Sequence, residues 1–178
     1  GCTAEAPPAM PDAACATDVE AYAAGHISAR GSIIVRMAED QRWLDTAQVD
    51  LQRIFELEPA VEGTASWKDD RTLLFTPRQR LEQERTYNVR VALNKLIEVP
   101  AELAELHFGF STIRQGIRTT VTDLQNHSLE DLRWQRLVFT VRTSDDATDQ
   151  DLEGCFSMEQ DGRKLSGRWE HAKGGRQH

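Results

Sequence analysis

Short runs in which apolar and polar side chains alternate dominate the middle of the chain. Residues 86–93 place Tyr87, Val89 and Val91 on one face, and residues 106–111 do the same with Leu106, Phe108 and Phe110. A two-residue period is that of a β-strand with one buried face. Further strands are predicted from β-branched and apolar runs at residues 32–37, 61–67 and 72–76. Short strands separated by Gly, Pro and Asp-Asp turns predict an antiparallel β-sandwich.

Helical signals are few in this region. Residues 45–54 combine a plausible cap with some 3.6-residue periodicity, but a strand from about residue 51 suits the sequence equally well and is favoured here. Residues 94–103 are compatible with one helical turn around Pro100. The sequence therefore predicts an all-β fold for this part of the chain.

The strand pattern starts again after Arg114. Four strand-like segments follow, at residues 117–124, 132–142, 152–158 and 164–169. Asp161-Gly162 lies between the last two and predicts a tight hairpin, since Asp-Gly tolerates positive φ. The first 18 residues are rich in Ala and Pro, as linkers are. We expect a linker at 1–18, a sandwich at 19–114, and a second β domain at 115–178 that is unusually small or incomplete.

Composition and charge narrow the class of protein. Of 178 residues, 39% are hydrophobic and 28% charged, so the chain can bury a core. The formal net charge is −8, and neither half of the chain carries a basic face that would suit nucleic acid. No run of about 18 apolar residues is present, so no membrane-spanning helix is expected.

The three cysteines point to a membrane anchor rather than to a metal or redox site. Cys2, Cys15 and Cys155 form no CxxC pair. The start, Gly-Cys-Thr-Ala-Glu-Ala-Pro-Pro, is typical of a bacterial lipoprotein after its signal peptide has been removed, which predicts lipidation of Cys2. The alternative is a chance cysteine. Whether Cys15 and Cys155 pair stays open.

Candidate chemistry is weak throughout the sequence. The five histidines lack HxxxH or HExxH spacing, and no serine has a Gly-x-Ser-x-Gly context. Four acids in residues 145–151 suit a solvated turn between strands better than a weak cation site, because an EF-hand spacing is absent. Asp69 and Asp70 suit a hairpin turn better than acid–base catalysis. We therefore expect no catalytic residue, metal site or cofactor, and not an enzyme.

Residues 57–77 and 86–91 resemble the bacterial Ig-like repeat. The shared pattern is a proline, a Gly-containing strand with an aromatic, an apolar strand ending in Phe-x-Pro, and Thr-Tyr-x-Val-x-Val. The flanks at 22–36 and 108–115 look like the beginning of Bacteroidetes-type alpha-2-macroglobulin family lipoproteins. The expected core comprises Trp67, Phe75, Tyr87, Val89, Val91, Phe108 and Phe110. Tyr87 is also expected to hydrogen-bond to backbone at a loop corner.

This resemblance implies a cell-envelope protein that traps proteases, lipid-anchored to the outer membrane and either periplasmic or surface-exposed. The chain would be its N-terminal, non-catalytic structural module, packed against downstream macroglobulin-like domains, with proteases as partners of the full-length protein. The family's thioester motif sets Cys and Gln three apart, whereas Cys155 and Gln160 lie five apart, so no thioester is expected. The alternative is an Ig-like surface adhesin or glycan-binding lipoprotein.

Overall fold

The computed structural model describes residues 9–10, 16–41, 51–130 and 133–171. It divides into two compact units, unit 1 (Gly1–Ile113) and unit 2 (Arg114–His178). Strands dominate both units, as the sequence predicted. No helix among the described residues is long and apolar enough to cross a membrane.

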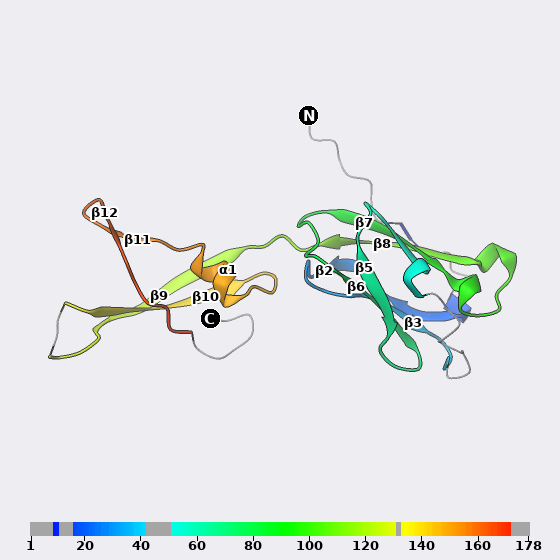
Figure 1. Cartoon of the computed structure of the whole chain (residues 1–178), viewed down its shortest axis with the longest axis horizontal. Coiled ribbons are helices and arrows are strands. Elements are labelled where there is room, and N and C mark those ends of the chain that lie inside the picture. The colour runs from blue at the N-terminus through cyan, green and yellow to red at the C-terminus, as the bar shows by residue number, and fades with distance from the viewer. Residues whose placement is uncertain (1–8, 11–15, 42–50, 131–132, 172–178) are drawn as a thin grey trace, which may run out of the picture. The chain divides into compact units, whose positions relative to one another are not determined.

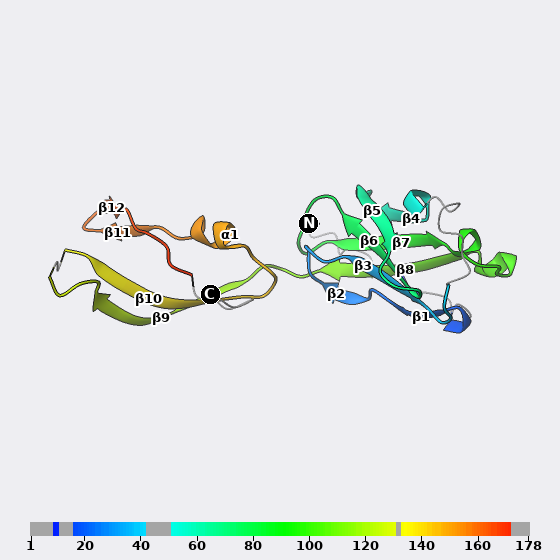
Figure 2. The same ribbon diagram turned by 60° about the horizontal axis from the view of Figure 1, so that its bottom comes forward.

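Unit 1 consists of two four-stranded sheets (Figures 1 and 2). The first has the order β1-β3-β6-β5, with β1 at Val19–Tyr22, β3 at Ile33–Met37, β6 at Thr72–Pro77 and β5 at Gly63–Trp67. The second has the order β2-β8-β7-β4, with β2 at Gly25–Ile27, β8 at Glu105–Thr112, β7 at Thr86–Ala92 and β4 at Phe55–Glu58. All pairs are antiparallel except β2 with β8.

This strand order is that of an immunoglobulin-like sandwich. If β3 to β8 are matched to immunoglobulin strands B to G, the first sheet reads A-B-E-D and the second contains C, F and G. The first strand of the fold is divided, so that β1 joins one sheet and β2 joins the other. The predicted fold class, an all-β chain with an immunoglobulin-like sandwich, is confirmed.

The core of unit 1 lies between the two sheets. Phe108 and Phe110 on β8, together with Ile33, Val35, Leu73 and Val91, are fully buried. Phe75, Tyr87 and Val89 also belong to this core, whereas Trp67 is only half-buried and packs against its margin. The rings of Tyr87 and Phe110 stack at 5.4 Å, and those of Phe55 and Phe75 meet at 5.4 Å. Alternation along each strand sends these side chains inward and their neighbours to solvent.

Local structure before β4 and after β7 differs in part from the sequence prediction. A single 3₁₀ turn, Leu51–Arg53, precedes β4, so the expected strand begins at Phe55 rather than at residue 51. Residues 45–50 of the competing helix lie outside the described residues. The expected turn around Pro100 is present as two 3₁₀ turns, Leu93–Lys95 and Ala101–Leu103.

The described part of unit 2 contains two hairpins and one short helix. Strands β9 (Ile117–Asn126) and β10 (Gln135–Thr143) form the first hairpin, and β11 (Met158–Gln160) and β12 (Arg163–Leu165) form the second. Asp161 and Gly162 have φ of 50° and 75°, so the predicted Asp-Gly turn is confirmed. Whether this unit is a macroglobulin-like domain stays a prediction.

The prediction of a strand at residues 152–158 is wrong for most of these residues. Helix α1 covers Asp149–Glu153, and only Met158 belongs to a strand. The Thr148 side chain accepts a hydrogen bond from the N–H of Asp151, and the Asp151 carboxylate accepts one from the N–H of Thr148. This capping box initiates a helix. The helix forms here although the apolar residues of the segment had predicted a strand.

Candidate functional site

The β9–β10 hairpin of unit 2 has one apolar face and one polar face. On the apolar face, Leu137 pairs with Leu124, Phe139 with Val121, and Val141 with Thr119. A register shift between Val138 and Phe139 marks a bulge that keeps these apolar pairs on the same side. The opposite face is mainly polar and carries Arg118, Thr120, Asp123, Gln125, Arg136, Thr140 and Arg142.

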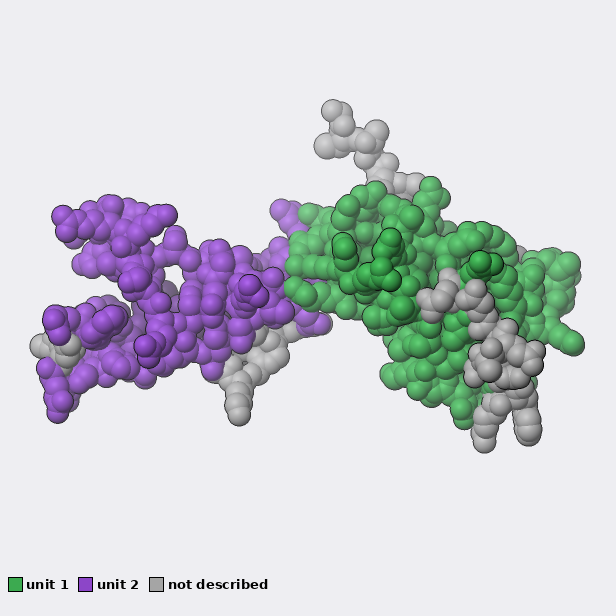
Figure 3. Space-filling model, viewed as in Figure 1, with its two compact units in different colours: residues 1–113 green, residues 114–178 purple. Residues whose placement is uncertain are grey.

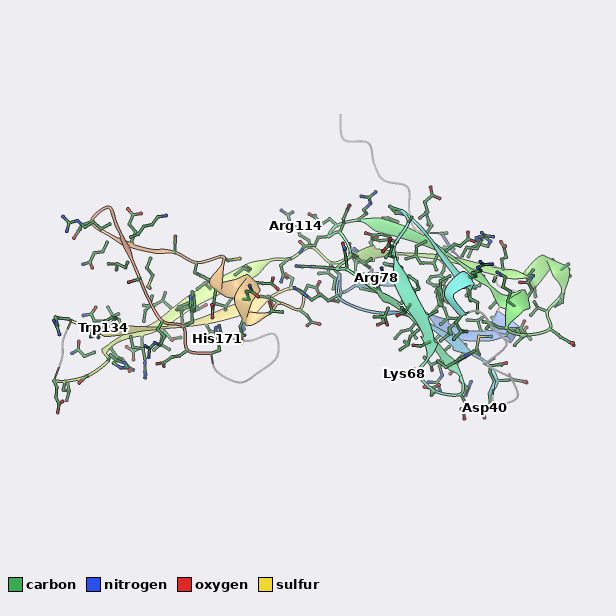
Figure 4. The ribbon with its side chains drawn as sticks, viewed as in Figure 1. Asp40, Lys68, Arg78, Arg114, Trp134 and His171 are labelled. Carbon is green, nitrogen blue, oxygen red and sulfur yellow. The ribbon has the colours of Figure 1, made fainter. Side chains whose placement is uncertain are left out.

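Only part of the apolar face is covered within unit 2. The Phe139 ring meets Phe156 at 5.3 Å and Trp169 at 5.7 Å. Val141 and Leu152 are 3% and 2% exposed, so a small core forms beneath α1. His171 stacks on Trp169, and one of its ring nitrogens lies 2.8 Å from the Glu153 carboxylate, which ties residues 169–171 to α1 (Figure 4).

Towards the tip of the hairpin the apolar side chains are uncovered. Val121 is 63% exposed, Leu124 59% and Trp134 60%. Leu129, Leu137 and Val138 are also exposed, as are Met158 and Leu165 on the second hairpin. In the space-filling view, the lobe that carries β11 and β12 stands apart from the lobe that carries the end of the β9–β10 hairpin (Figure 3). We call the uncovered residues of the apolar face, Val121, Leu124 and Leu137, the tip patch.

The tip patch is unusual for a soluble surface. Single exposed apolar side chains are common, but a contiguous group marks a protein or ligand interaction surface. A two-stranded sheet is also marginally stable by itself and gains stability from packing against a further layer. Unit 1 differs, since most of its large apolar side chains form one cluster between the sheets.

The tip patch was not predicted from the sequence. Residues 117–124 and 132–142 were predicted to be strands, and no cover for their apolar faces was predicted. Alternation predicts which side chains share a face, but not whether a second layer covers that face. The sequence does not show how many strands pack over the hairpin, so the exposure of its apolar face could not be predicted.

Of the three cysteines, only Cys155 lies within the described residues. Cys155 is an exposed free thiol whose Sγ donates to the carbonyl of Asp151. Cys2, predicted to be lipidated, and Cys15 lie outside the described residues. Among the residues that the structure describes, no group of three or more His, Cys, Asp or Glu side chains is placed to hold a metal ion.

The sequence predicted a solvated turn between two strands at residues 145–151. Asp146, Asp149 and Asp151 are exposed, but the segment leads from β10 into helix α1 rather than into a strand. Asp145 is fully buried, and its carboxylate accepts a hydrogen bond from the N–H of Asp146. The Gln115 side chain binds the backbone of Asp145 twice: it accepts a hydrogen bond from the N–H at 2.8 Å and donates one to the carbonyl at 3.2 Å. Asp151 caps α1. Asp151 therefore holds the start of the helix, whereas Asp145 is fixed in the segment before it.

The expected hairpin turn at Asp69 is confirmed. Lys68 N–H donates to the carbonyl of Thr72, and the Asp69 carboxylate accepts from the N–H of Arg71 at 2.9 Å. The hydrogen bond from the Arg71 backbone, followed by one from the Thr72 side chain, lowers the pKa of Asp69. A carboxylate held ionised by backbone donors stabilises a turn and is a poor general acid.

A chain of ion pairs crosses the outer surface of the second sheet. Arg90 on β7 pairs with Glu56 on β4 and, at 2.6 Å, with Glu105 on β8, and His107 lies 3.1 Å from Glu105. The hydrogen bond from Arg90 lowers the pKa of Glu105. The His107 side chain is 57% exposed, so its predicted outward orientation is confirmed. These cross-strand pairs stabilise the sheet and enclose no cavity.

Comparison with known proteins gives structural likenesses only. No family model matches the chain, and no curated protein matches it. L,D-transpeptidase 3 from Mycobacterium tuberculosis, solved with a faropenem-derived adduct, is similar with 12% identity and a TM-score of 0.41, over 56% of this chain and 39% of that one. An L,D-transpeptidase from M. tuberculosis H37Rv is similar with 10% identity and a TM-score of 0.41, over 72% of this chain and 76% of that one. An L,D-transpeptidase from M. smegmatis is similar with 12% identity and a TM-score of 0.38, over 71% of this chain and 74% of that one.

These likenesses correct one expectation from the sequence. The chain was expected not to be an enzyme, yet the solved structures it resembles are those of L,D-transpeptidases, which are enzymes. That expectation is therefore withdrawn. At 10–12% identity and TM-scores of 0.38–0.41, the likeness does not assign an activity to this chain. The chain spans about two fifths of the first of these structures.

Proposed function

We propose that the chain is an interaction module in which unit 2 docks, through the tip patch, on an adjoining domain of the same protein. The observation that supports this proposal is the half-covered apolar face of the β9–β10 hairpin. Its inner part is packed under Phe156 and Trp169, while Val121 and Leu124 are about three-fifths exposed. The occupant would be a strand or sheet edge with alternating apolar side chains.

The edges of the hairpin support an occupant of this type. Among the described residues, β9 and β10 are paired only with each other, so each has an outer edge with backbone N–H and C=O groups directed away from the sheet. An added strand would bond to such an edge and place its apolar side chains on the same face beside the tip patch, so that the apolar face becomes broader. Main-chain hydrogen bonds and apolar burial would then act together.

The larger setting follows from the sequence resemblance. We propose a cell-envelope protein, lipid-anchored through Cys2 to the outer membrane, whose downstream domains are macroglobulin-like and engage proteases. This setting rests on the start of the chain and on residues 22–36, 57–91 and 108–115. Unit 1 would act as a rigid immunoglobulin-like spacer, and unit 2 would contact the next domain.

Hydrogen exchange tests the docking proposal. We expect amides of residues 117–126 and 135–141 to exchange more slowly in the full-length protein than in this chain alone, because docking covers them. Leu124→Asp in the full-length protein should abolish that difference. Thr120→Asp introduces the same charge on the opposite, polar face and is the matched control. Equal exchange in both proteins, or equal effects of the two variants, would overturn the proposal.

A second candidate function is glycan binding, and one observation favours it. Trp134 is 60% exposed beside the tip of the hairpin, and an exposed indole can stack on the apolar face of a sugar ring (Figure 4). A glycan array distinguishes the two functions. Glycan binding that is lost in Trp134→Ala would support an adhesin. If no glycan binds, docking remains the single proposed function.

A further inference from the structure

Two residues meet on the outer face of the second sheet, on its central strands β7 and β8 (Figure 2). Tyr87 and Val89 on β7 are buried in the core, so Asn88 between them points outward, and it is exposed. Gly109 on β8 pairs with Asn88 across the strands and belongs to the same outer face. This face therefore has a position without a side chain directly beside the Asn88 amide.

The backbone conformation does not explain the glycine at position 109. Among the described glycines, positive φ occurs at Gly25 and Gly162, so Gly109 has a φ that other residues adopt. A glycine inside a strand weakens it and often marks a place where another backbone approaches closely. Gly109 is buried, whereas the side chain of His107, the preceding outward residue of β8, is 57% exposed. Neighbouring groups therefore cover the outer face at Gly109.

A residue from the N-terminal segment lies at this place. The N–H of Ala9 donates a hydrogen bond to Oδ1 of Asn88 at 3.1 Å, across 79 positions of the sequence. Ala9 is half-buried, whereas Met10 beside it is 84% exposed. Ala9 therefore lies against the sheet, although the composition of residues 1–18 had predicted only a linker.

We propose that Asn88 and Gly109 form a binding site for the N-terminal segment of this chain, with Ala9 as the bound residue. The amide oxygen of Asn88 supplies the acceptor for the Ala9 N–H. Gly109 supplies the space in which the backbone and the methyl group of Ala9 approach the sheet. The segment is then attached to unit 1 well before the first strand begins at Val19.

This attachment shortens the tether between the proposed lipid anchor and unit 1. The seven residues from Cys2 to Ala9 span at most about 25 Å when fully extended, whereas the seventeen from Cys2 to Val19 would span about 60 Å. Unit 1 would thus be held to less than half of the distance that a free linker allows. The shorter tether rests on the proposed lipidation of Cys2, but the binding of Ala9 does not.

NMR relaxation of the backbone amides of this chain tests the binding of Ala9. We expect an order parameter of about 0.85 at Ala9, as in the strands, and a value below about 0.6 in Asn88→Ala. Hydrogen exchange of the Ala9 amide should be roughly fivefold faster in that variant, because one hydrogen bond is lost. Asn88→Asp keeps an oxygen acceptor and should retain the order. Asn94→Ala removes the same side chain from another exposed position and is the matched control.

Gly109→Val tests the space beside Asn88. Valine suits a strand, and its side chain should displace Ala9 and lower the Ala9 order parameter as Asn88→Ala does. His107→Val places the same side chain where one is already present and is the control. Thermal unfolding shows whether each variant folds, and if Gly109→Val does not fold, Asn88→Ala and its rescue by Asn88→Asp decide the outcome.

Three results would overturn the proposal. The first is an order parameter below about 0.6 at Ala9 in the parent chain. The second is Ala9 order that survives in Asn88→Ala or in a folded Gly109→Val, and the third is an equal loss of order in Asn94→Ala. Mass spectrometry of the native N-terminus tests the anchor separately, since a free thiol at Cys2 would remove the shorter tether and leave the binding of Ala9 unaffected.

Discussion

The hydroxyl oxygen of Tyr87 accepts a hydrogen bond from the backbone N–H of Glu82 at 3.1 Å. This contact ties the second residue of β7 to the loop that leads into it. The ring of the same tyrosine is 3% exposed and stacks on Phe110. Tyr87 therefore occupies the position of the tyrosine corner in immunoglobulin-like sandwiches.

Tyr87→Phe should destabilise unit 1 by about 1 kcal/mol, because the ring stays packed while the N–H of Glu82 loses its acceptor. Urea unfolding of the whole chain measures this loss. Tyr22→Phe removes a hydroxyl from the ring that packs on Phe108 and is the control. An unchanged urea midpoint for Tyr87→Phe would show that the hydrogen bond between Tyr87 and Glu82 does not stabilise unit 1.

Phe75→Ala should destabilise unit 1 by about 3–5 kcal/mol, since it removes a buried ring and leaves a cavity beside Phe55. Trp67 was expected from the sequence to belong to the same core, but its side chain is only half-buried. Trp67 Nε1 is also buried without a hydrogen-bond partner among the described residues. Trp67→Phe should therefore cost less than Phe75→Ala in calorimetry, and the reverse order would contradict this placement of the core.

The strongest alternation in the sequence correctly predicted two strands whose inward faces are closely packed. Residues 86–93 and 106–111 correspond to β7 and β8, whose inward side chains form the centre of the core. Their period is a local property, so it can be read without knowing the partner strand. The Asp-Gly and Asp69 turns were predictable for the same reason, because the backbone conformation follows from the turn residues themselves.

The short strands were not predictable in this way. Strand β2 has only three residues and pairs with β8 in parallel. Its first residue, Gly25, has a φ of 69°. A segment of this length shows no period, and its structure comes from a tertiary partner. The tip patch was unpredictable for a related reason, because its exposure depends on which other elements pack over the hairpin.

Gly63→Ala should destabilise unit 1 by about 1–3 kcal/mol through overpacking. A Cβ at this position would overlap the ring of Phe75 and lie 2.6 Å from the carbonyl oxygen of Thr76. The backbone oxygen belongs to the neighbouring strand and cannot move without disturbing its pairing. Gly154→Ala is the control, since its nearest neighbour would be 3.5 Å away. Equal thermal stability of both variants would show that β5 can shift.

Acid should weaken unit 1 through Glu105 and Asp69. Hydrogen bonds from Arg90 and from the Arg71 backbone lower their pKa values below the ordinary 4.5 and 3.8. The unfolded chain regains the ordinary values, so below about pH 4.5 it binds more protons than the folded chain. The resulting stability is present above that pH and is lost as the pH falls through the folded-state pKa values.

Glu105→Gln should therefore lower the free energy of unfolding at neutral pH, and its difference from the parent chain should shrink as the pH falls below about 4.5. Urea unfolding at a series of pH values measures this convergence. Glu102→Gln, at an exposed glutamate three residues away, is the control. A difference between Glu105→Gln and the parent that stays constant down to about pH 2.5 would mean that the side chain stabilises by packing rather than by its charge.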